Sequence, residues 1–439
     1  MRAILTSFGT EGAITPFVTL ASALLSRGHQ VSLLTNHRHC ERFAGLGCEL
    51  VPLDTAQEYR AFIEDGYLLS TPDRVPEMFR RYYLPKLLPE LALIKKRTAA
   101  ATPCVIVASE TPGIAARLAA ESLRVPLVSV LVQPNHLSTQ EIYKGLIGSV
   151  LEPEINSCRR ALGLAPRADL RAWWDELDRY LALWPSWFAP EFSGWARTTY
   201  AGLLGYKSGG VAPSWFTGQG VRPSILITGG TAHLAGRAFF AASCAALSGV
   251  AESAVLLCSQ PEILPSHLPS ALKVVPWVDS FSAAVREVDV LIHHGGMGTI
   301  SQALAVGTPQ LVLADGGDRP ENGRFIEGLG VGRFLPRPQW TAENIRAAVA
   351  AIVGSLDIRA RCAELASCCD GPAATATAVQ VVEAVAAVPG RSDARAASLL
   401  APPADPSRAL LARLEALPAD KRLLLRTRFH QAAAKLQQS

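Results

Sequence analysis

The chain has 439 residues, of which 49% are hydrophobic and 18% are charged, and its formal net charge is +4. This length allows two domains of ordinary size with residues to spare, and this apolar content excludes a wholly disordered chain. The small net charge gives no support for nucleic-acid binding, which needs clustered Lys and Arg.

The nine cysteines are scattered along the chain and form no C-x-x-C pair. That distribution is typical of reduced thiols and predicts neither a disulfide framework nor a zinc site. The first residues form a short apolar strand and do not resemble a signal peptide. The most apolar stretch, residues 373–388, is interrupted by Gln380 and Glu383, so we expect no stable membrane insertion and a cytoplasmic location.

The first half of the chain alternates short apolar strands with amphipathic helical segments. It opens with a strand, a glycine-bearing turn at residues 9–12 and a helix. Because strands joined by helical crossovers pair in parallel, this half predicts a doubly wound α/β unit with helices on both faces of the sheet. The predicted strands are residues 2–7, 30–34, 105–108 and 127–131, and the predicted helices include residues 16–27 and 113–122.

The same pattern restarts near residue 221 and predicts a second doubly wound unit. Residues 203–222 are rich in Gly, Pro and Ser, which is typical of a linker between domains. We therefore expect domains at residues 1–205 and 221–388, followed by a linker and a short helical tail at residues 389–439. The predicted strands of the second unit are residues 224–228, 254–257, 272–275, 290–293 and 310–314.

Five of the eight tryptophans fall between residues 173 and 195. We favour core packing near the end of the first unit for these side chains. An aromatic wall of a binding pocket is the alternative, since indole rings serve both purposes.

A glycine-rich turn follows the predicted buried strand at residues 290–293. It reads His293-His-Gly-Gly-Met-Gly-Thr299, and a helix is expected to begin near its last residue. Glycines let backbone amides approach a ligand closely, and the N-terminus of a helix favours a phosphate. His293 could add a hydrogen bond to that phosphate. The alternative is a turn without a ligand, because glycine turns between strands and helices are common.

A polar segment follows the next strand, at residues 310–314. We expect Asp318, Arg319 and Asn322 in a loop past the carboxyl end of that strand, where open α/β sheets bind ligands. Asp318 could accept hydrogen bonds from two sugar hydroxyls. A solvated acidic loop without a ligand is the alternative.

These motifs, in this order, resemble one protein family over roughly residues 1–388. The chain is similar to bacterial GT-B glycosyltransferases of the rhamnolipid rhamnosyltransferase type, which are related to macrolide and vancomycin-type glycosyltransferases. The resemblance implies two Rossmann-like domains facing across a cleft, with the acceptor in the first and the nucleotide sugar in the second. It also implies that the final helix crosses back toward the first domain. The matching motifs are Gly9-Thr-Glu-Gly-Ala-Ile-Thr-Pro-Phe, Arg27-Gly-His-Gln-Val, Leu183-Trp-Pro-Ser-Trp, Thr228-Gly-Gly-Thr-Ala, the glycine-rich turn and Asp318-Arg-Pro-Glu-Asn.

The resemblance implies a donor site in the second domain, for a UDP- or dTDP-sugar and without a metal or other cofactor. It places the nucleobase near Trp277 and Val278, and the donor sugar near Asp318. Relatives usually have Gln after that aspartate, whereas this chain has Arg319, which could meet a phosphate or a charged sugar. The residues implied to hold the diphosphate are Thr231, His293, Gly295, Gly296, Met297, Gly298 and Thr299.

The resemblance also implies a general base in the first glycine turn, and this chain departs from it. Relatives have Asp or sometimes His at the position that is Ala13 here, and a methyl group cannot take a proton. Another group could serve as the base: Glu11, Glu110 or His136. Plant relatives place a histidine-assisting aspartate near the position of Glu110, although a surface carboxylate is the alternative there. The acceptor could instead be acidic already, or the protein could have lost catalysis.

The sequence therefore predicts an inverting glycosyltransferase that moves a hexose or deoxyhexose to a hydrophobic natural-product or lipid-like acceptor. The alternative is a catalytically lapsed GT-B-like subunit that binds or scaffolds within a biosynthetic pathway. Residues 410–426 resemble short segments around modules of non-ribosomal peptide and polyketide synthases. They would form a docking helix for a synthase or carrier protein, and a solvated helical extension is the alternative.

Overall fold

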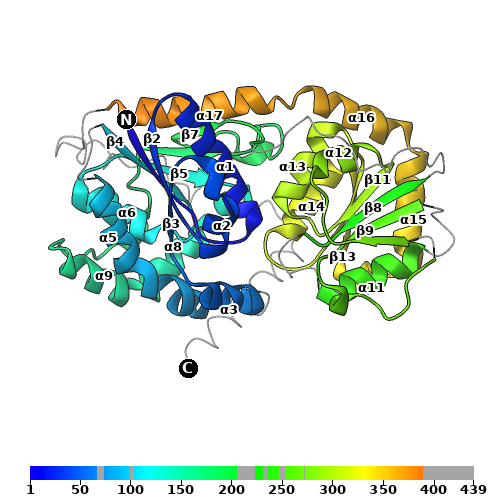
Figure 1. Cartoon of the computed structure of the whole chain (residues 1–439), viewed down its shortest axis with the longest axis horizontal. Helices are drawn as coiled ribbons and strands as arrows, with labels where there is room; N and C mark the ends of the chain where they lie inside the picture. The colour runs from blue at the N-terminus through cyan, green and yellow to red at the C-terminus, as the bar shows by residue number, and fades with distance from the viewer. Residues whose placement is uncertain are drawn as a thin grey trace, which may run out of the picture. The chain divides into compact units, whose positions relative to one another are not determined.

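Two parallel β-sheets organise the chain, one in each half of the sequence (Figure 1). The computed structural model describes residues 1–66, 74–98, 103–204, 223–230, 236–247, 253–270 and 272–388. The first sheet has seven strands in the order β3-β2-β1-β4-β5-β6-β7, and the second has six in the order β10-β9-β8-β11-β12-β13. In each sheet the first strand in sequence, β1 or β8, lies in the interior. The chain adds strands on one side of it and then on the other, as doubly wound folds require.

The central strands are apolar along their whole length because helices cover both faces of each sheet. In β4 (Cys104–Ser109) and β5 (Leu127–Leu131) every residue is buried. The other strands of the first sheet are β1 (Arg2–Thr6), β2 (Gln30–Thr35), β3 (Glu49–Pro52), β6 (Arg179–Ala182) and β7 (Thr198–Tyr200). Those of the second are β8 (Ser224–Thr228), β9 (Ser253–Leu257), β10 (Leu272–Val275), β11 (Val290–His293), β12 (Gln310–Ala314) and β13 (Gly332–Pro336).

The helices connect successive strands and carry the remaining core. Those associated with the first sheet are α1 (Glu11–Ser26), α2 (His37–Arg42), α3 (Ala56–Gly66), α4 (Val75–Met78), α5 (Leu87–Thr98), α6 (Ile114–Leu123), α7 (Asn135–Ser138), α8 (Gln140–Ser149), α9 (Glu152–Ala161) and α10 (Leu170–Trp174). The later helices are α11 (Gly236–Leu247), α12 (Phe281–Arg286), α13 (Met297–Val306), α14 (Arg319–Gly328), α15 (Ala342–Gly354), α16 (Leu356–Ser367) and α17 (Gly371–Ala386).

All nine strands predicted from the sequence are present. The strands that the sequence did not predict are β3, β6, β7 and β13, of which β3, β7 and β13 lie at the edges of the sheets. The predicted start of the first helix at residue 16 was wrong, because α1 begins at Glu11 and contains Pro16 within it. An acidic residue in the first turn suits the positive end of the helix dipole, which favours the earlier start.

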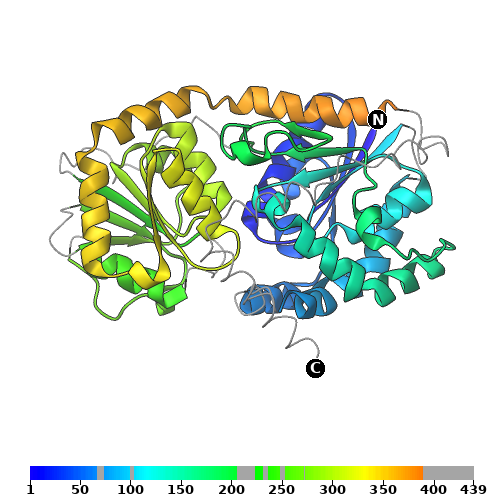
Figure 2. The same ribbon diagram turned by 180° about the vertical axis from the view of Figure 1, so that it is seen from behind.

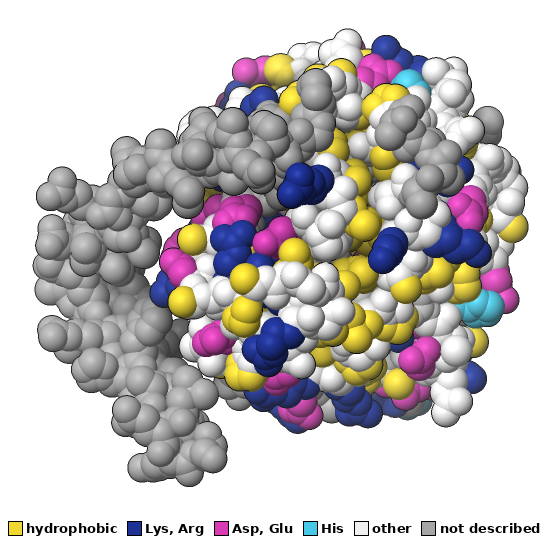
Figure 3. All heavy atoms as spheres, turned by 90° about the vertical axis from the view of Figure 1, so that its left-hand side faces the viewer, with side chains coloured by type: hydrophobic (Ala, Val, Ile, Leu, Met, Phe, Trp, Pro, Cys, Tyr) yellow, Lys and Arg dark blue, Asp and Glu magenta, His cyan; other side chains and the backbone are white. Residues whose placement is uncertain are grey.

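The surface is mixed in charge, as the small net charge predicts. On the face shown in Figure 3, basic and acidic side chains are interspersed with apolar ones. None of the described helices is both long enough and apolar enough to cross a membrane. Of the predicted linker at residues 203–222, Leu203 and Leu204 are described and buried, whereas residues 205–222 and the predicted tail at residues 389–439 lie outside the described residues.

The last described helix, α17, packs against the first sheet although it follows the second one in sequence (Figures 1 and 2). Its side chains Ala378, Val379 and Val382 are fully buried in one core with residues of β1 and α1. Glu383 forms an ion pair with Arg27 Nε at 3.1 Å and a hydrogen bond with His29 Nε2 at 2.7 Å. The prediction that the final helix crosses back is confirmed.

Also confirmed is core packing for the tryptophan-rich segment. Trp173, Trp174 and Trp184 are at most 1% exposed, and Trp187 and Trp195 pack against the same core. These indole rings contribute apolar area to the first domain and do not line an open pocket.

The contribution of α17 can be measured with Val382→Ala. Removing two methyl groups from a side chain that is 0% exposed should lower the free energy of unfolding by about 2 kcal/mol. Urea denaturation followed by tryptophan fluorescence measures this change. Val388→Ala, at an exposed position just beyond the helix, is the control and should change it by less than about 0.5 kcal/mol. Equal effects of the two variants would contradict the burial of α17.

Candidate donor and acceptor sites

His293 ends β11 and holds the glycine-rich turn in place. Its Nδ1 accepts a hydrogen bond from the Gly295 amide at 3.1 Å, and its Nε2 lies 3.1 Å from Gln310 Oε1. The neutral ring therefore carries its proton on Nε2, and burial lowers the pKa of His293 to about 4. Because both ring nitrogens are engaged within the protein, this geometry does not support the predicted hydrogen bond from His293 to a diphosphate.

The next residue, His294, lies between two glycine turns and is partly exposed. A Cβ atom at Gly230 would come within 2.4 Å of its ring, and one at Gly296 within 2.5 Å. Gly230 follows β8 and Gly296 follows β11, and these strands are neighbours in the sheet. Burial, followed by the charges of His293 and Arg319, lowers the pKa of His294 to about 3. Sequence reasoning did not single out His294, although glycines on both sides of its ring were the available signal.

Helix α13 begins directly after this turn. Gly295 has a φ angle of +90°, which favours glycine, and the Gly296 carbonyl accepts hydrogen bonds from the amides of Thr299 and Ile300. The amides before Thr299 come too early in the helix to have intrahelical acceptors. They point out of the N-terminus, where an anion also meets the positive end of the dipole. The geometry fits the predicted diphosphate contact by backbone amides.

Asn322 joins the two predicted donor motifs. Its fully buried side-chain amide donates to the Gly295 carbonyl at 3.0 Å and to Asp318 Oδ2 at 2.7 Å. The expected loop is in fact helical from Arg319 onward, since α14 begins there and Asp318 is its N-terminal neighbour. Burial raises the pKa of Asp318, and the charge of Arg319 and the hydrogen bond from Asn322 oppose that change.

The predicted nucleobase contacts separate into one exposed and one buried residue. Trp277 follows β10 and is 50% exposed, and the guanidinium carbon of Arg42 lies 4.9 Å from the centroid of its ring. Val278 is only 6% exposed and packs in a core with Leu226 and Leu291. The side chain of Val278 is therefore part of the core. Thr231 lies outside the described residues.

In the first domain, the β1–α1 turn is fixed by residues that follow β2. The Gly9 amide donates to Asn36 Oδ1 at 2.8 Å, and Asn36 Nδ2 donates to Asp54 Oδ2 at 2.7 Å. His39 Nε2 lies 3.2 Å from the Gly9 carbonyl. Each strand end is thus tied to its neighbour, which positions the turn that carries Ala13.

Glu11, one of the predicted bases, is the first residue of α1. Its carboxylate is paired with the guanidinium of Arg42, and His39 Nδ1 lies 4.0 Å from it. The side chain is 18% exposed, and the ion pair with Arg42 occupies part of the carboxylate.

Glu110, the second predicted base, is 3% exposed and is surrounded by donors. It accepts hydrogen bonds from Trp174 Nε1 at 2.7 Å, from Arg117 at 2.8 Å and from the Ser129 hydroxyl. The alternative of a surface carboxylate was wrong. The catalytic role also loses support, because a buried carboxylate that already accepts from three donors has little capacity left for an acceptor hydroxyl.

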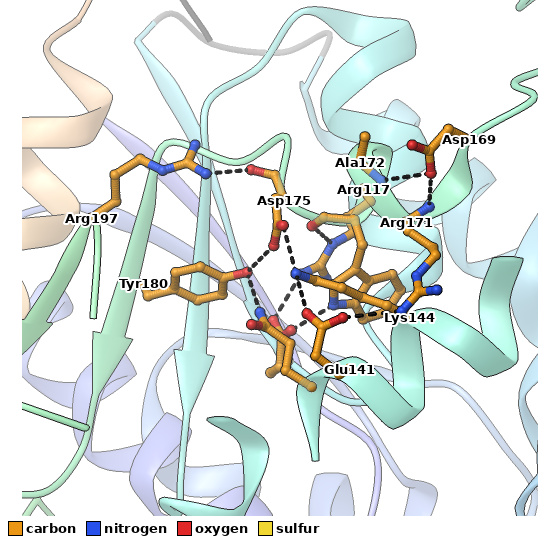
Figure 4. Close-up of polar contacts among 12 residues, drawn as sticks. Arg117, Glu141, Lys144, Asp169, Arg171, Ala172, Asp175, Tyr180 and Arg197 are labelled. Atoms are coloured by element: carbon orange, nitrogen blue, oxygen red, sulfur yellow. Dashed lines mark hydrogen bonds and ion pairs between the residues drawn. The ribbon is translucent and has the colours of Figure 1, made fainter. Parts of the chain in front are cut away.

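A second polar cluster lies beside Arg117 (Figure 4). Asp175 accepts from Lys144 Nζ at 2.6 Å and from the Tyr180 hydroxyl at 3.2 Å. The Tyr180 hydroxyl therefore both donates and accepts, because it also accepts a hydrogen bond from Gln140 Nε2 at 2.8 Å. The cluster connects α8, α10 and β6, and it fixes the interior of the first domain.

His136, the third predicted base, is 9% exposed in α7. Burial lowers its pKa to about 4, and the negative charge of Glu110 partly opposes that change. The structure therefore brings Glu110 and His136 within electrostatic range of each other. The Nδ1 atom of His136 is buried and has no hydrogen-bond partner among the described residues.

No group of three or more His, Cys, Asp or Glu side chains in the described ranges could hold a metal ion. The cysteines in those ranges are thiols outside any disulfide bond. The candidate donor site consists of backbone amides, His294, Asp318 and Asn322.

Comparison with known proteins agrees with this geometry. The family described as erythromycin biosynthesis protein CIII-like, C-terminal domain, matches residues 247–389. Oleandomycin glycosyltransferase of Streptomyces antibioticus is 24% identical over 381 residues, covering 81% of this chain and 84% of its own length. Glycosyltransferase GtfC of Amycolatopsis orientalis is 26% identical over 430 residues, covering 88% and 98%.

The solved structure of glycosyltransferase VinC in complex with dTDP has a TM-score of 0.64 at 18% identity. The match covers 88% of this chain and 99% of that one. The fold is therefore GT-B. The chain is an enzyme of the glycosyltransferase class, similar to bacterial macrolide and glycopeptide glycosyltransferases.

Gly296→Ala tests the packing of His294. The new methyl group would lie about 2.5 Å from the imidazole Nε2, so the ring must leave its place between the glycine turns. We expect the affinity for dTDP, measured by calorimetry, to fall at least ~10-fold, which corresponds to ~1.4 kcal/mol. Gly354→Ala, where a Cβ meets nothing within 4 Å, is the control and should leave the affinity unchanged. An unchanged affinity in Gly296→Ala would refute the proposed role of this turn.

Glu110→Gln distinguishes a structural role from a catalytic one. The substitution leaves the buried guanidinium of Arg117 without its counter-charge, so the free energy of unfolding should fall by about 3 kcal/mol. Glu364→Gln, in an exposed ion pair, should change it by less than about 1 kcal/mol. Urea denaturation measures both. A Glu110→Gln protein of normal stability that has lost turnover would support the catalytic role predicted from the sequence.

Proposed function

We propose that this chain is an inverting glycosyltransferase that moves a hexose or deoxyhexose from a dTDP- or UDP-sugar to a hydrophobic acceptor. The observation that carries the donor half is the side chain of Asn322, which joins the glycine-rich turn to Asp318. Two motifs separated along the chain thereby form one site at the carboxyl ends of β11 and β12, where doubly wound sheets bind nucleotides.

In this site the diphosphate lies on the N-terminus of α13, against backbone amides and the ring of His294. As the bond to the sugar breaks, negative charge develops on the leaving diphosphate, and preorganised amides and a helix dipole stabilise it. The proposal needs no metal, because these groups supply the stabilisation. The complex of VinC with dTDP supports a thymidine nucleotide over other diphosphates.

Asp318 is the group proposed to orient the donor sugar. One of its oxygens accepts from Asn322, which leaves the other available for a sugar hydroxyl. The side chain of Arg319, which is 5% exposed, donates from Nε to the Gly316 carbonyl at 3.0 Å. This bond holds the loop between β12 and α14, so we assign Arg319 to the shape of the donor site.

The acceptor is proposed to bind in the first domain beside an aromatic cluster. The ring of Phe8, two residues beyond β1, lies 5.0 Å from Phe62 and 5.8 Å from Tyr83 in edge-to-face arrangements. Aromatic side chains of this kind favour an apolar ligand. Oleandomycin glycosyltransferase, a relative named for oleandomycin, supports a natural-product acceptor. Lipid-like acceptors, which the motifs that resemble rhamnolipid rhamnosyltransferases imply, are proposed as the second class.

Inversion requires direct attack by the acceptor oxygen on the anomeric carbon, with its proton passing to a base. Ala13 cannot take that proton. Of the three candidates, Glu11 is the most accessible, although Arg42 neutralises it. An acceptor that is already acidic, such as a carboxylate, a phosphate or a phenol, would reduce the need for a base. The enzyme is proposed to act in the cytoplasm, and residues 389–439, proposed to dock a synthase or carrier protein, lie outside the described residues.

The donor half is tested by calorimetry of dTDP and UDP with the purified protein and with Asn322→Ala. Loss of the two hydrogen bonds should weaken binding of the preferred diphosphate about 10-fold or more. Asn344→Ala, at an exposed position in α15, is the control and should bind normally. Slow release of the diphosphate from a matching sugar donor is the expected sign of activity. Binding without turnover across a panel of donors would instead favour the catalytically lapsed subunit.

A further inference from the structure

Glu90 is unusual among the shielded carboxylates of the first domain. Each of the others has several donors or a full counter-charge: Asp54 with Asn36 and the His37 amide, Glu110 with Arg117, and Glu121 with Arg159 and Arg167. Glu90 has one hydrogen-bond partner in the described part of the chain, the hydroxyl of Thr6 at 2.6 Å. Shielding a carboxylate with a single neutral donor costs stability, and such groups are concentrated at functional sites.

The position of Glu90 is at the end of the sheet where the acceptor is proposed to bind. Thr6 is the last residue of β1, and Glu90 projects to it from α5, which packs on that strand. The next residue, Ser7, donates a hydrogen bond to the carbonyl of Ala13 at 3.3 Å. Glu90 and the turn that lacks a base are therefore anchored to consecutive residues of the chain. The Glu90 residue is buried in part only.

The charged side chains on α5 and on the elements packed against it either have other partners or are exposed. Phe8 lies two residues beyond Thr6, and Lys86, in the short turn before α5, stands over the Phe8 ring at 5.7 Å. Other charged side chains on α5, Lys95 and Lys96, are exposed. The remaining charged groups on the elements packed against α5 have partners elsewhere: Arg2 with the Arg97 carbonyl, Lys86 with Glu58, Arg97 with Glu49, Arg117 with Glu110, and Glu121 with Arg159.

Burial raises the pKa of Glu90 to about 7, and the hydrogen bond from Thr6 acts in the opposite direction. A base with a pKa near the working pH is the most effective kind, because it is both available and strong enough to remove a proton. Glu11, by contrast, is held in an ion pair with Arg42.

We propose that Glu90 is the general base of the transfer and replaces the carboxylate that is absent at Ala13. The acceptor oxygen forms a bond to the anomeric carbon as its proton passes to the Glu90 carboxylate. The bond between that carbon and the diphosphate oxygen breaks, and the diphosphate leaves with the electron pair. Glu90 then returns the proton to water. This role rests on the proposed transfer reaction, and it assigns a neutral hydroxyl, not an acidic group, as the reacting part of the acceptor.

The test compares Glu90→Gln with wild type on two probe acceptors, 1-octanol and 4-nitrophenol, with dTDP-glucose as donor. At pH 8 the phenol is already ionised and needs no base, whereas the alcohol does. We expect kcat/KM for the alcohol to fall about 100-fold or more and that for the phenol to fall much less, with dTDP affinity unchanged. Glu77→Gln, an exposed residue of α4, is the matched control and should behave as wild type.

Thr6→Val supplies a second readout that a purely structural role would not produce. Without the hydroxyl, the charged form of Glu90 is less stabilised, so its pKa should rise further. The pH at which kcat/KM for the alcohol reaches half its maximum should be near 7 in wild type, higher in Thr6→Val and absent from Glu90→Gln. An identical pH profile in all three proteins would overturn the proposal.

Thermal unfolding tests the environment of Glu90 without activity. The folded pKa lies above the unfolded value of 4.5, so the native state binds more protons, and the ionised group destabilises it as pH rises through 7. The difference in Tm between Glu90→Gln and wild type should therefore grow in favour of the variant from pH 5 to pH 8. A constant difference would overturn the proposal.

The outcomes separate this proposal from the proposed function. A wild-type protein that turns over donor while Glu90→Gln does so equally with the alcohol contradicts the role of Glu90 alone. A wild-type protein that releases no diphosphate from any donor contradicts both.

Discussion

The hydrogen bonds from the Asn322 amide to the Gly295 carbonyl and to Asp318 hold together the part of the molecule on which the donor site depends. One buried side chain spans two neighbouring strand ends, so the turn after β11 and the helix after β12 cannot move independently. The buried side chain of His293 also holds the turn, because it is hydrogen-bonded to the Gly295 amide and to Gln310. The main-chain amides proposed to hold the diphosphate are thus kept in place by the side chains of Asn322 and His293, an arrangement that needs little reorganisation during reaction.

The first domain is arranged on a different basis. Its interior contains many charged groups, and most are paired with opposite charges, as Glu110 is with Arg117 and Glu121 is with Arg159 and Arg167. Such pairs are costly to break and hold helices such as α6 and α9 in one position. Glu90 differs from these carboxylates, because its partner among the described residues is the neutral hydroxyl of Thr6 and not a cation.

Much of the fold could be predicted from the sequence, because parallel strands buried on both faces read as continuous apolar runs. The strands that were missed include short, partly exposed ones such as β7, whose Thr-Thr-Tyr carries no apolar run. The candidate site was harder to predict from the sequence. Spacing located the glycine-rich turn, but which of the two adjacent histidines faces inward depends on the neighbouring strands. Glu90 gave no local signal at all, since its partner Thr6 is 84 residues away.

Helix α17 has a consequence for how the protein is made. The β1 and α1 residues that it covers are synthesised first, yet their apolar surface finds its cover only when residues near 378–382 have left the ribosome. Part of the core of the first half therefore stays exposed to solvent until α17 has been synthesised. Contacts this distant in sequence slow folding and lengthen exposure to aggregation. Expression of the first half alone should consequently yield an insoluble product. If the gene were split between the two sheets, the fragment that contains the first sheet would need α17 from the other fragment to complete its core.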